Sequence, residues 1–240
     1  MLILLWELTG RVGIYPQYIF PPFSCVVESF TNIKYLHSVI ENTIVTLIRA
    51  GLGFVIGTIV GIALGFVLVG LRLAEYVQPI ATIFFVIPSV VWIPLLILWI
   101  GLDPLKLPLA AAFICSFPPI LYGILNSSRT VDLDQVEVAL TLGADPWTVL
   151  RKVIIPLAVL KTLPIMKTEA IMVFKTIIVV EMVTLSSGLG YLLLTYSLTI
   201  DVQHVLATIM VLSLIMVGII ELIDVLEKKI ASKWIGEVYW

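Results

Sequence analysis

Apolar stretches long enough to cross a lipid bilayer make up most of this chain. A membrane-spanning helix needs about 20 mainly apolar residues, and five stretches approach or exceed that length, at about 38–69, 77–100, 107–125, 164–185 and 204–226. Of the 240 residues, 60% are hydrophobic and only 12% are charged. Backbone groups inside a bilayer have no water to bond, so such stretches must be helical. The sequence therefore predicts an all-α integral membrane protein with five full spans.

The N-terminal region predicts a short first helix and an interfacial segment. Residues 1–9 are apolar but too short to span a bilayer alone, and the pattern breaks at Gly10-Arg11. The stretch MLILLWEL has no basic region and no small-residue cleavage site, so we expect no cleavable signal peptide. Prolines and aromatic residues at 15–23 are typical of an irregular segment at the membrane surface. A short amphipathic helix is expected at about 25–36.

Helix-breaking residues mark three of the spans. Pro88 and Pro94 predict a kink or an unwound turn in the second span. Pro118-Pro119 predict an interruption of the third span. The run 186–190 predicts a break after the fourth span, and a short re-entrant or interfacial helix is expected at 191–200.

Glycines recur every four residues in the first span. They lie near one helix face and let a neighbouring helix approach closely, which favours plain helix packing over a role in lining a pathway. The four residues are Gly53, Gly57, Gly61 and Gly65.

A polar segment, at 127–161, separates the third and fourth spans and is rich in helix-capping signals. Asp132 predicts the start of a short helix, with Gln135 as its capping-box partner. Gly143 supplies the left-handed residue that ends this helix. Asp145-Pro146 predicts the start of a second helix. A loop with so fixed a shape is interpreted as a docking surface for a cytoplasmic partner.

The basic residues orient the chain in the membrane. With the polar segment placed inside and the spans alternating, only three basic residues fall outside, namely Arg11, Lys34 and Lys106. Nine fall inside, namely Arg72, Arg129, Arg151, Lys152, Lys161, Lys167, Lys228, Lys229 and Lys233. Because cytoplasmic loops carry an excess of Lys and Arg, we expect a multi-pass protein of the cytoplasmic membrane with a cytoplasmic C-terminus.

Charged residues inside spans are costly and usually face a bundle interior or water. Arg49, Lys175 and Glu181 are such residues. Lys175 fits either a path for an anionic solute or a structural ion pair. Glu181 lies six residues further on, a rotation of about 240°, so the two are poorly placed to pair within one helix and a partner from another helix or subunit is open.

Two further groups of residues are candidates for the translocation pathway. Glu181 lies close to the glycine-rich break, and with Gly188 and Gly190 it is a candidate for an outer gate. The kinked second span supplies the other candidates for lining the path, namely Pro88, Trp92 and Pro94.

The sequence offers no nucleotide or metal motif. No P-loop, HExxH or CxxC pattern is present, and the net charge of −2 gives no indication of nucleic-acid binding. Cys25 and Cys115 are interpreted as small apolar residues, and His37 and His204 stand alone. A membrane-embedded enzyme would need paired His/Glu or a Ser/Lys set at one depth. A stand-alone secondary transporter, the other alternative, would usually show internal repeats.

The polar segment carries a family motif. Glu137–Gly143, followed thirteen residues after the glycine by Pro156, resembles the "EAA" loop of ABC importer permeases, with Val138 in place of the first alanine of the motif. Further stretches resemble the nitrate/sulfonate/taurine branch of these permeases: Ile87-Pro88-Ser89, Ile93–Gly101, Glu181-Met182 and Ser187–Leu192.

This resemblance implies a type I ABC importer permease bundle, a single transmembrane domain over residues 1–240. It implies a homodimer, two cytoplasmic ATP-binding-cassette ATPase subunits and an extracytoplasmic substrate-binding protein. A small anionic solute, such as nitrate, a sulfonate or taurine, would be moved by alternating access. The chain itself would bind no cofactor, because ATP and Mg are used by the ATPase. The residues implied in ATPase coupling are Glu137, Ala139, Leu140, Gly143, Ala144 and Pro156.

Overall fold

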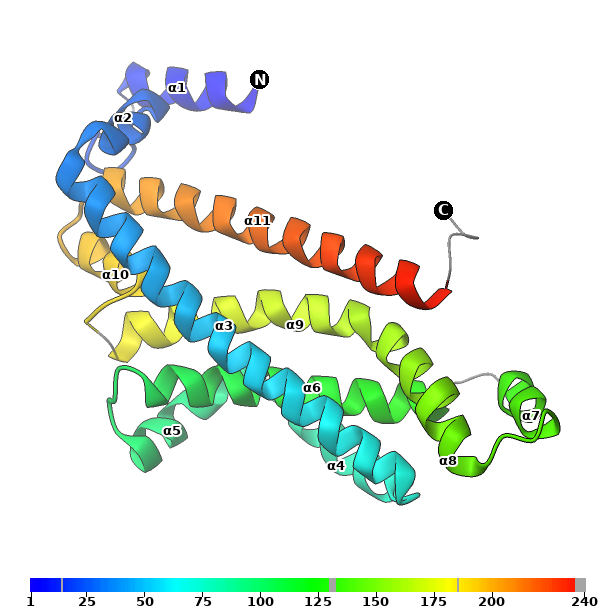
Figure 1. The fold of residues 1–240 in the computed structure, drawn as a ribbon. Helices are drawn as coiled ribbons and strands as arrows, with labels where there is room; N and C mark the ends of the chain where they lie inside the picture. The colour runs from blue at the N-terminus through cyan, green and yellow to red at the C-terminus, as the bar shows by residue number, and fades with distance from the viewer. Residues whose placement is uncertain (14, 130–132, 185, 236–240) are drawn as a thin grey trace.

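The computed structural model describes residues 1–13, 15–129, 133–184 and 186–235, and these are organised into helices (Figure 1). The α-helices are α1 Leu2–Val12, α2 Phe23–Glu28, α3 Ile33–Gly70, α4 Ala74–Val86, α5 Ile93–Ile100, α6 Lys106–Arg129, α7 Leu133–Thr141, α8 Pro146–Val149, α9 Ile155–Thr184, α10 Leu189–Leu198 and α11 Val202–Ile235. Two short 3₁₀ helices, η1 Ser29–Thr31 and η2 Ser89–Trp92, and one π-helical segment, η3 Leu150–Ile154, join them.

The five predicted spans are present by length and composition. Three described helices are long and apolar enough to cross a membrane, namely α3, α6 and α11. Two bent pairs also qualify. The first joins α4 to η2–α5 with a bend of 87°. The second joins the helical stretch Pro146–Thr184, which comprises α8, η3 and α9, to α10 with a bend of 48°. The predicted all-α membrane fold is therefore confirmed.

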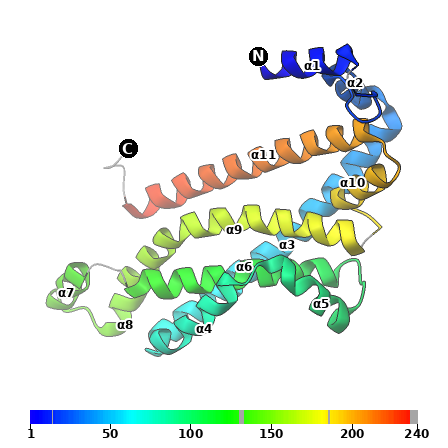
Figure 2. The same cartoon turned by 180° about the vertical axis from the view of Figure 1, so that it is seen from behind.

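The glycine stripe of α3 packs directly against α6. Both helices run in the same direction in Figures 1 and 2, with α6 behind α3 in the first view. A Cβ at Gly65 would lie 2.7 Å from Ile124 Cγ2, and one at Gly61 would lie 3.1 Å from Ile120 Cγ2. The residues of α6 that face the four glycines are themselves spaced by four, in the order Ala112, Ser116, Ile120 and Ile124. The close helix approach that the spacing predicts is confirmed.

The predicted break in the second span occurs at Pro88. Ile87 and Pro88 are extended, with ψ angles of 121° and 129°, and η2 follows. Ser89 Oγ shares a 2.8 Å hydrogen bond with Thr176 Oγ1 of α9, which fixes the broken span against that helix. Pro94 lies in the first turn of α5, where its missing N–H costs no helical bond.

Pro118-Pro119 do not interrupt the third span, so that expectation was wrong. Both residues are buried inside the continuous helix α6. Proline removes a backbone hydrogen bond and usually kinks an isolated helix. Here α6 is packed against α3, α4 and α9, and this tertiary packing holds the helix together through the two prolines.

Some predicted boundaries also differ. The helix α1 continues through Gly10-Arg11, because Arg11 Nε donates a 2.6 Å hydrogen bond to Glu7 and Gly10 packs against the backbone of Pro22. The predicted helix at 25–36 is divided at Asn32, whose side chain accepts bonds from the first backbone N–H groups of α3. The polar segment at 127–161 is shorter as a loop, because α6 and α9 both extend into it.

The glycine stripe generates a stability prediction with a matched control on the same helix. A Cβ at Gly57 would meet the Ser116 side chain and lie 3.2 Å from the backbone nitrogen of Phe117, whereas one at Gly51 meets open space. Gly57→Ala should destabilise the fold by about 1–3 kcal/mol through overpacking. Gly51→Ala should leave stability unchanged or raise it by up to about 1 kcal/mol, since alanine favours helix. Thermal unfolding of the detergent-purified variants measures both, and equal effects would contradict tight α3–α6 packing.

Candidate functional site

The coupling segment, residues 133–156, has a well-defined turn at Gly143. The glycine has φ +88°, its N–H donates to Leu140 O at 2.9 Å, and the N–H of Ala144 donates to Ala139 O at 3.1 Å. This pair of bonds is the Schellman motif that ends a helix at a left-handed residue. The predicted C-terminal position of Gly143 is confirmed. A Cβ there meets open space, so the requirement for glycine is conformational.

Asp145 begins the second helix of the segment, as predicted. Its carboxylate accepts hydrogen bonds from the backbone N–H groups of Trp147 and Thr148 at 3.1 and 3.2 Å, and from the Thr148 hydroxyl. The Thr148 hydroxyl bond, followed by these N–H bonds, lowers the pKa of Asp145 from its ordinary value. Pro146 follows at the first helical position. The predicted cap by Asp132 and Gln135 lies outside the described residues and side chains.

A π-helical segment links this cap to the fourth span. Leu150–Ile154 form π turns between α8 and α9, and the buried Pro156 follows in the first turn of α9. Proline has no N–H to donate to the preceding turn, and π segments often occur at functional positions in helices. The segment therefore joins the loop to α9 as one continuous helical stretch, Pro146–Thr184, which curves between α8 and α9 in Figure 1.

The apolar residues of the coupling segment have two different surroundings. Val136, Leu140 and Trp147 line a groove of about 740 Å³ together with the end of α3, and Trp147 is also among the exposed residues. Val138, Leu142 and Trp147 are 58%, 82% and 67% exposed. Of the other predicted coupling residues, Glu137 is exposed, whereas Ala139 and Ala144 are half-buried. An exposed apolar patch of this kind is typical of a protein-binding surface.

A cavity with a mainly apolar lining and a few polar side chains lies where the broken span meets α9. It has a volume of about 420 Å³ and is lined by residues of α4, the break, η2, α6 and α9. Pro88 and Lys175, both predicted pathway residues, line it together, and Lys175 is exposed. Glu169 lines the same cavity and is only 7% exposed. The sequence analysis missed Glu169, although an acidic residue within a predicted span is the same signal that singled out Lys175.

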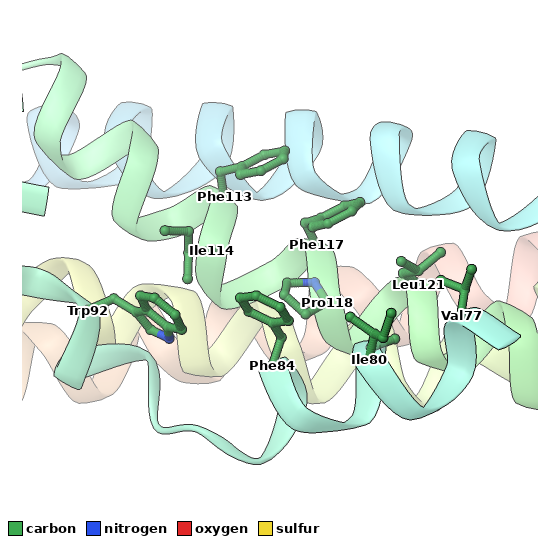
Figure 3. A pocket seen from close by; sticks show the side chains of 10 residues that line it. Val77, Ile80, Phe84, Trp92, Phe113, Ile114, Phe117, Pro118 and Leu121 are labelled. Atoms are coloured by element: carbon green, nitrogen blue, oxygen red, sulfur yellow. The ribbon is translucent and has the colours of Figure 1, made fainter. Parts of the chain in front are cut away.

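An apolar pocket of about 300 Å³ adjoins this cavity (Figure 3). In the figure the rings of Trp92 and Phe84 lie side by side, and they stack with a centroid distance of 5.6 Å. Phe84 and Ile114 line both spaces and so form the wall between them. Of the predicted pathway residues in the second span, Trp92 therefore lies in the apolar pocket. Pro94 lines neither space in the described part of the chain.

Glu181 forms a buried ion pair with Arg49 of α3. The Arg49 guanidinium donates a 2.9 Å bond to Glu181 Oε1, and the two residues are 5% and 0% exposed. Thr46 of α3 also donates to the carboxylate, at 2.9 Å. The partner of Glu181 thus comes from another helix, one of the possibilities that the sequence leaves open.

The same network satisfies the backbone where α9 ends. Arg49 donates to Ser187 O at 2.8 Å, Thr46 Oγ1 accepts from Leu189 N at 2.9 Å, and Glu181 accepts from Gly190 N at 3.1 Å. Asn42 accepts the N–H of Gly188. Gly188 has φ +108°, and a Cβ there would strike the Glu181 carboxylate. A Cβ on Gly190 would strike the Ile178 carbonyl oxygen. The two glycines therefore allow the turn to close over a buried charge.

The ion pair generates a double-mutant prediction. Arg49→Met should destabilise the protein by about 3–5 kcal/mol, because it leaves the Glu181 carboxylate buried without its cation. Combining it with Glu181→Leu should recover part of that loss, so the two single effects should not add. The exposed pair of His37 and Glu41 on α3 is the control, and Glu41→Gln should cost less than about 1 kcal/mol. Denaturation of the purified variants measures these effects, and additive losses would argue against coupling.

Comparison with known proteins identifies the family. The model of the family described as binding-protein-dependent transport system inner membrane component matches residues 53–233. A putative ABC transporter permease protein of Methanocaldococcus jannaschii is 30% identical over 89% of this chain and 81% of its own length. A putative aliphatic sulfonates transport permease protein of Bacillus subtilis is 26% identical over 98% of this chain and 84% of its own length.

Solved structures show the same fold. The crystal structure of an amino acid ABC transporter with histidines matches 83% of this chain and 97% of its own, with a TM-score of 0.69 and 21% identity. An inward-facing MetNI methionine ABC transporter matches 81% of this chain and 95% of its own, with a TM-score of 0.60 and 20% identity. The family match covers most of the helical bundle, and the chain belongs to the binding-protein-dependent transport system inner membrane components, the permeases of ABC importers.

Proposed function

We propose that this permease works as a homodimer with two cytoplasmic ATPase subunits and an extracytoplasmic binding protein. ATP and Mg²⁺ act in the ATPase, and this chain contributes the membrane path and no catalysis. Alternating access moves a small anionic solute through that path.

The shape of the coupling segment is the observation that carries this proposal. Its two short helices are fixed by the turn at Gly143 and the cap at Asp145, and they expose Val138, Leu142 and Trp147. A fixed apolar surface outside the spans fits the groove of a protein partner better than it fits water. Because the segment continues through η3 into α9, a displacement at the ATPase reaches the helix that carries Lys175 and Glu181.

The distribution of basic residues supports the orientation. The coupling segment, the end of α3 and the C-terminal part of α11 lie at one end of the bundle in Figures 1 and 2. The helices α1, α2, α5 and α10 lie at the other end. Nine basic residues of the sequence belong to the first end and three to the second. The coupling end and the C-terminus are therefore assigned to the cytoplasm.

The anionic solute is proposed from Lys175. Its side chain is exposed on a cavity beside the broken span, where a cation favours a negative group. Among the relatives, the Bacillus subtilis protein is named for aliphatic sulfonates, and a permease of Escherichia coli that is 23% identical over 99% of this chain and 88% of its own length is named for taurine. Both names are compatible with a sulfonate group at Lys175.

Co-purification with the ATPase tests the assembly. The chain should be co-expressed with its candidate ATPase subunit and purified in detergent. We expect a 2:2 complex whose proteoliposomes take up solute only with ATP and the binding protein. A chain that transports alone would instead support the secondary-transporter alternative, and one that recruits no ATPase would overturn the proposal.

The turn at Gly143 supplies the mutational test of coupling. Gly143→Asp should leave the protein inserted but abolish ATP-driven uptake, because a side chain at φ +88° strains the turn by about 1–2 kcal/mol and places a charge in the docking surface. Gly13→Asp is the matched control, since Gly13 also ends a helix at positive φ, +75°, with open space around it. It lies at the opposite end of the bundle and should leave uptake unchanged. Undiminished uptake by Gly143→Asp would contradict the docking role.

A further inference from the structure

Glu169 is a largely buried acid of the fourth span that has no partner among the described residues. The residue is 7% exposed, and no hydrogen bond or ion pair joins it to another of the described residues. Burying a charge without a counter-charge is expensive. Glu181, the other buried acid of α9, has Arg49, Thr46 and Gly190 as partners. Glu169 has no such arrangement among the described residues, so its carboxyl group is available to a group from outside the described chain.

Glu169 lines the cavity between the broken span and α9. Lys175 lines the same space and likewise makes no hydrogen bond or ion pair with the described part of the chain. Six residues of helix separate the two positions, a rise of about 9 Å. An unpaired carboxyl group and an unpaired ammonium group therefore flank one cavity of about 420 Å³.

The remaining walls of the cavity suit a small polar solute. Ser89 and Thr176 line it with hydroxyl groups that already bond each other. Phe85, Met172 and Val179 supply apolar surface. A few polar groups on a mainly apolar lining are typical of sites that orient a small ligand.

We propose that this cavity binds a small zwitterionic solute, whose anionic group pairs with Lys175 and whose cationic group pairs with Glu169. The inference rests on the proposed transport function and changes its solute from a simple anion to a molecule that carries a cationic group as well as the anionic one. A simple anion would meet the Lys175 ammonium but would be repelled by an ionised Glu169 on the wall of the same cavity. A solute with an amino group at one end and a sulfonate or carboxylate at the other pairs with both.

A pair of probes that differ in one charge tests the inference. Taurine and ethanesulfonate share the sulfonate group, and only taurine has the amino group. Binding of each should be measured by calorimetry on the permease–ATPase complex in nanodiscs, without the binding protein. We expect taurine to bind at least about 10-fold more tightly, because a site that pairs a substrate group discriminates against the analogue that lacks it.

Two variants assign the two charges. Glu169→Gln should weaken taurine binding and strengthen ethanesulfonate binding, so that the two probes bind about equally, and the retained ethanesulfonate binding shows that the variant is folded. Lys175→Gln should weaken both probes. Glu75→Gln and Lys106→Gln are the controls, since neither residue lines the cavity and both side chains are exposed, at 72% and 75%. Neither control should change the taurine preference.

Three results would overturn the inference: equal affinity for the two probes, an unchanged taurine preference in Glu169→Gln, and no binding of either probe. These results leave the proposed function standing if the complex assembles and its ATP-driven uptake depends on Gly143. Conversely, a chain that recruits no ATPase would overturn the proposed function. The same titration on the permease alone in nanodiscs would still decide what the cavity binds.

Discussion

A bilayer offers no water to a broken helix, and this constraint governs how the two breaks of the bundle are built. At the end of α9, side chains replace the missing helical bonds. Arg49 satisfies a carbonyl of the turn, while Asn42, Thr46 and Glu181 accept three consecutive N–H groups. Three of these four side chains come from α3, so the first span fixes the geometry of the fourth. The buried ion pair is therefore part of the backbone support of the turn as well as a contact between helices.

The helix α9 connects the coupling segment, the cavity and the turn that follows Glu181. It begins at the π segment behind the coupling turn, carries Glu169 and Lys175 beside the cavity, and ends at Glu181. The hydrogen bond between Thr176 and Ser89 attaches the broken second span to α9. In the proposed mechanism, a displacement of the coupling segment moves one packed element. The cavity wall formed by α9 and the turn held by Glu181 then shift together.

The sequence predicted those features whose conformation depends on one or two neighbouring residues. The glycine spacing predicted close approach by a neighbouring helix, though not that this helix is α6. Gly143, Asp145 and Pro88 predicted their turn, cap and break, since backbone conformation there depends on one or two residues. The break predicted at Pro118-Pro119 was wrong, because packing against three helices outweighed the tendency of proline to interrupt a helix. The pairing of Arg49 with Glu181 spans 132 positions and has no local signal. The predicted cap of the first short helix depends on Asp132 and on the side chain of Gln135, which the structure does not describe, so this cap stays a prediction.

The two buried acids of α9 differ in a way that bears on function. Both lie in an environment where an isolated charge is costly. Glu181 is compensated from within the chain, and the compensation locks a turn. Glu169 is left uncompensated beside a cavity that a lysine also lines. A permease that compensated both acids internally would have no buried charge to offer a solute. Leaving one uncompensated makes the empty cavity less favourable, and a ligand with a matching cation relieves that cost on entry. The unpaired Glu169 therefore lets the path select solutes that carry a cationic group as well as an anionic one, in addition to the selection made by the binding protein.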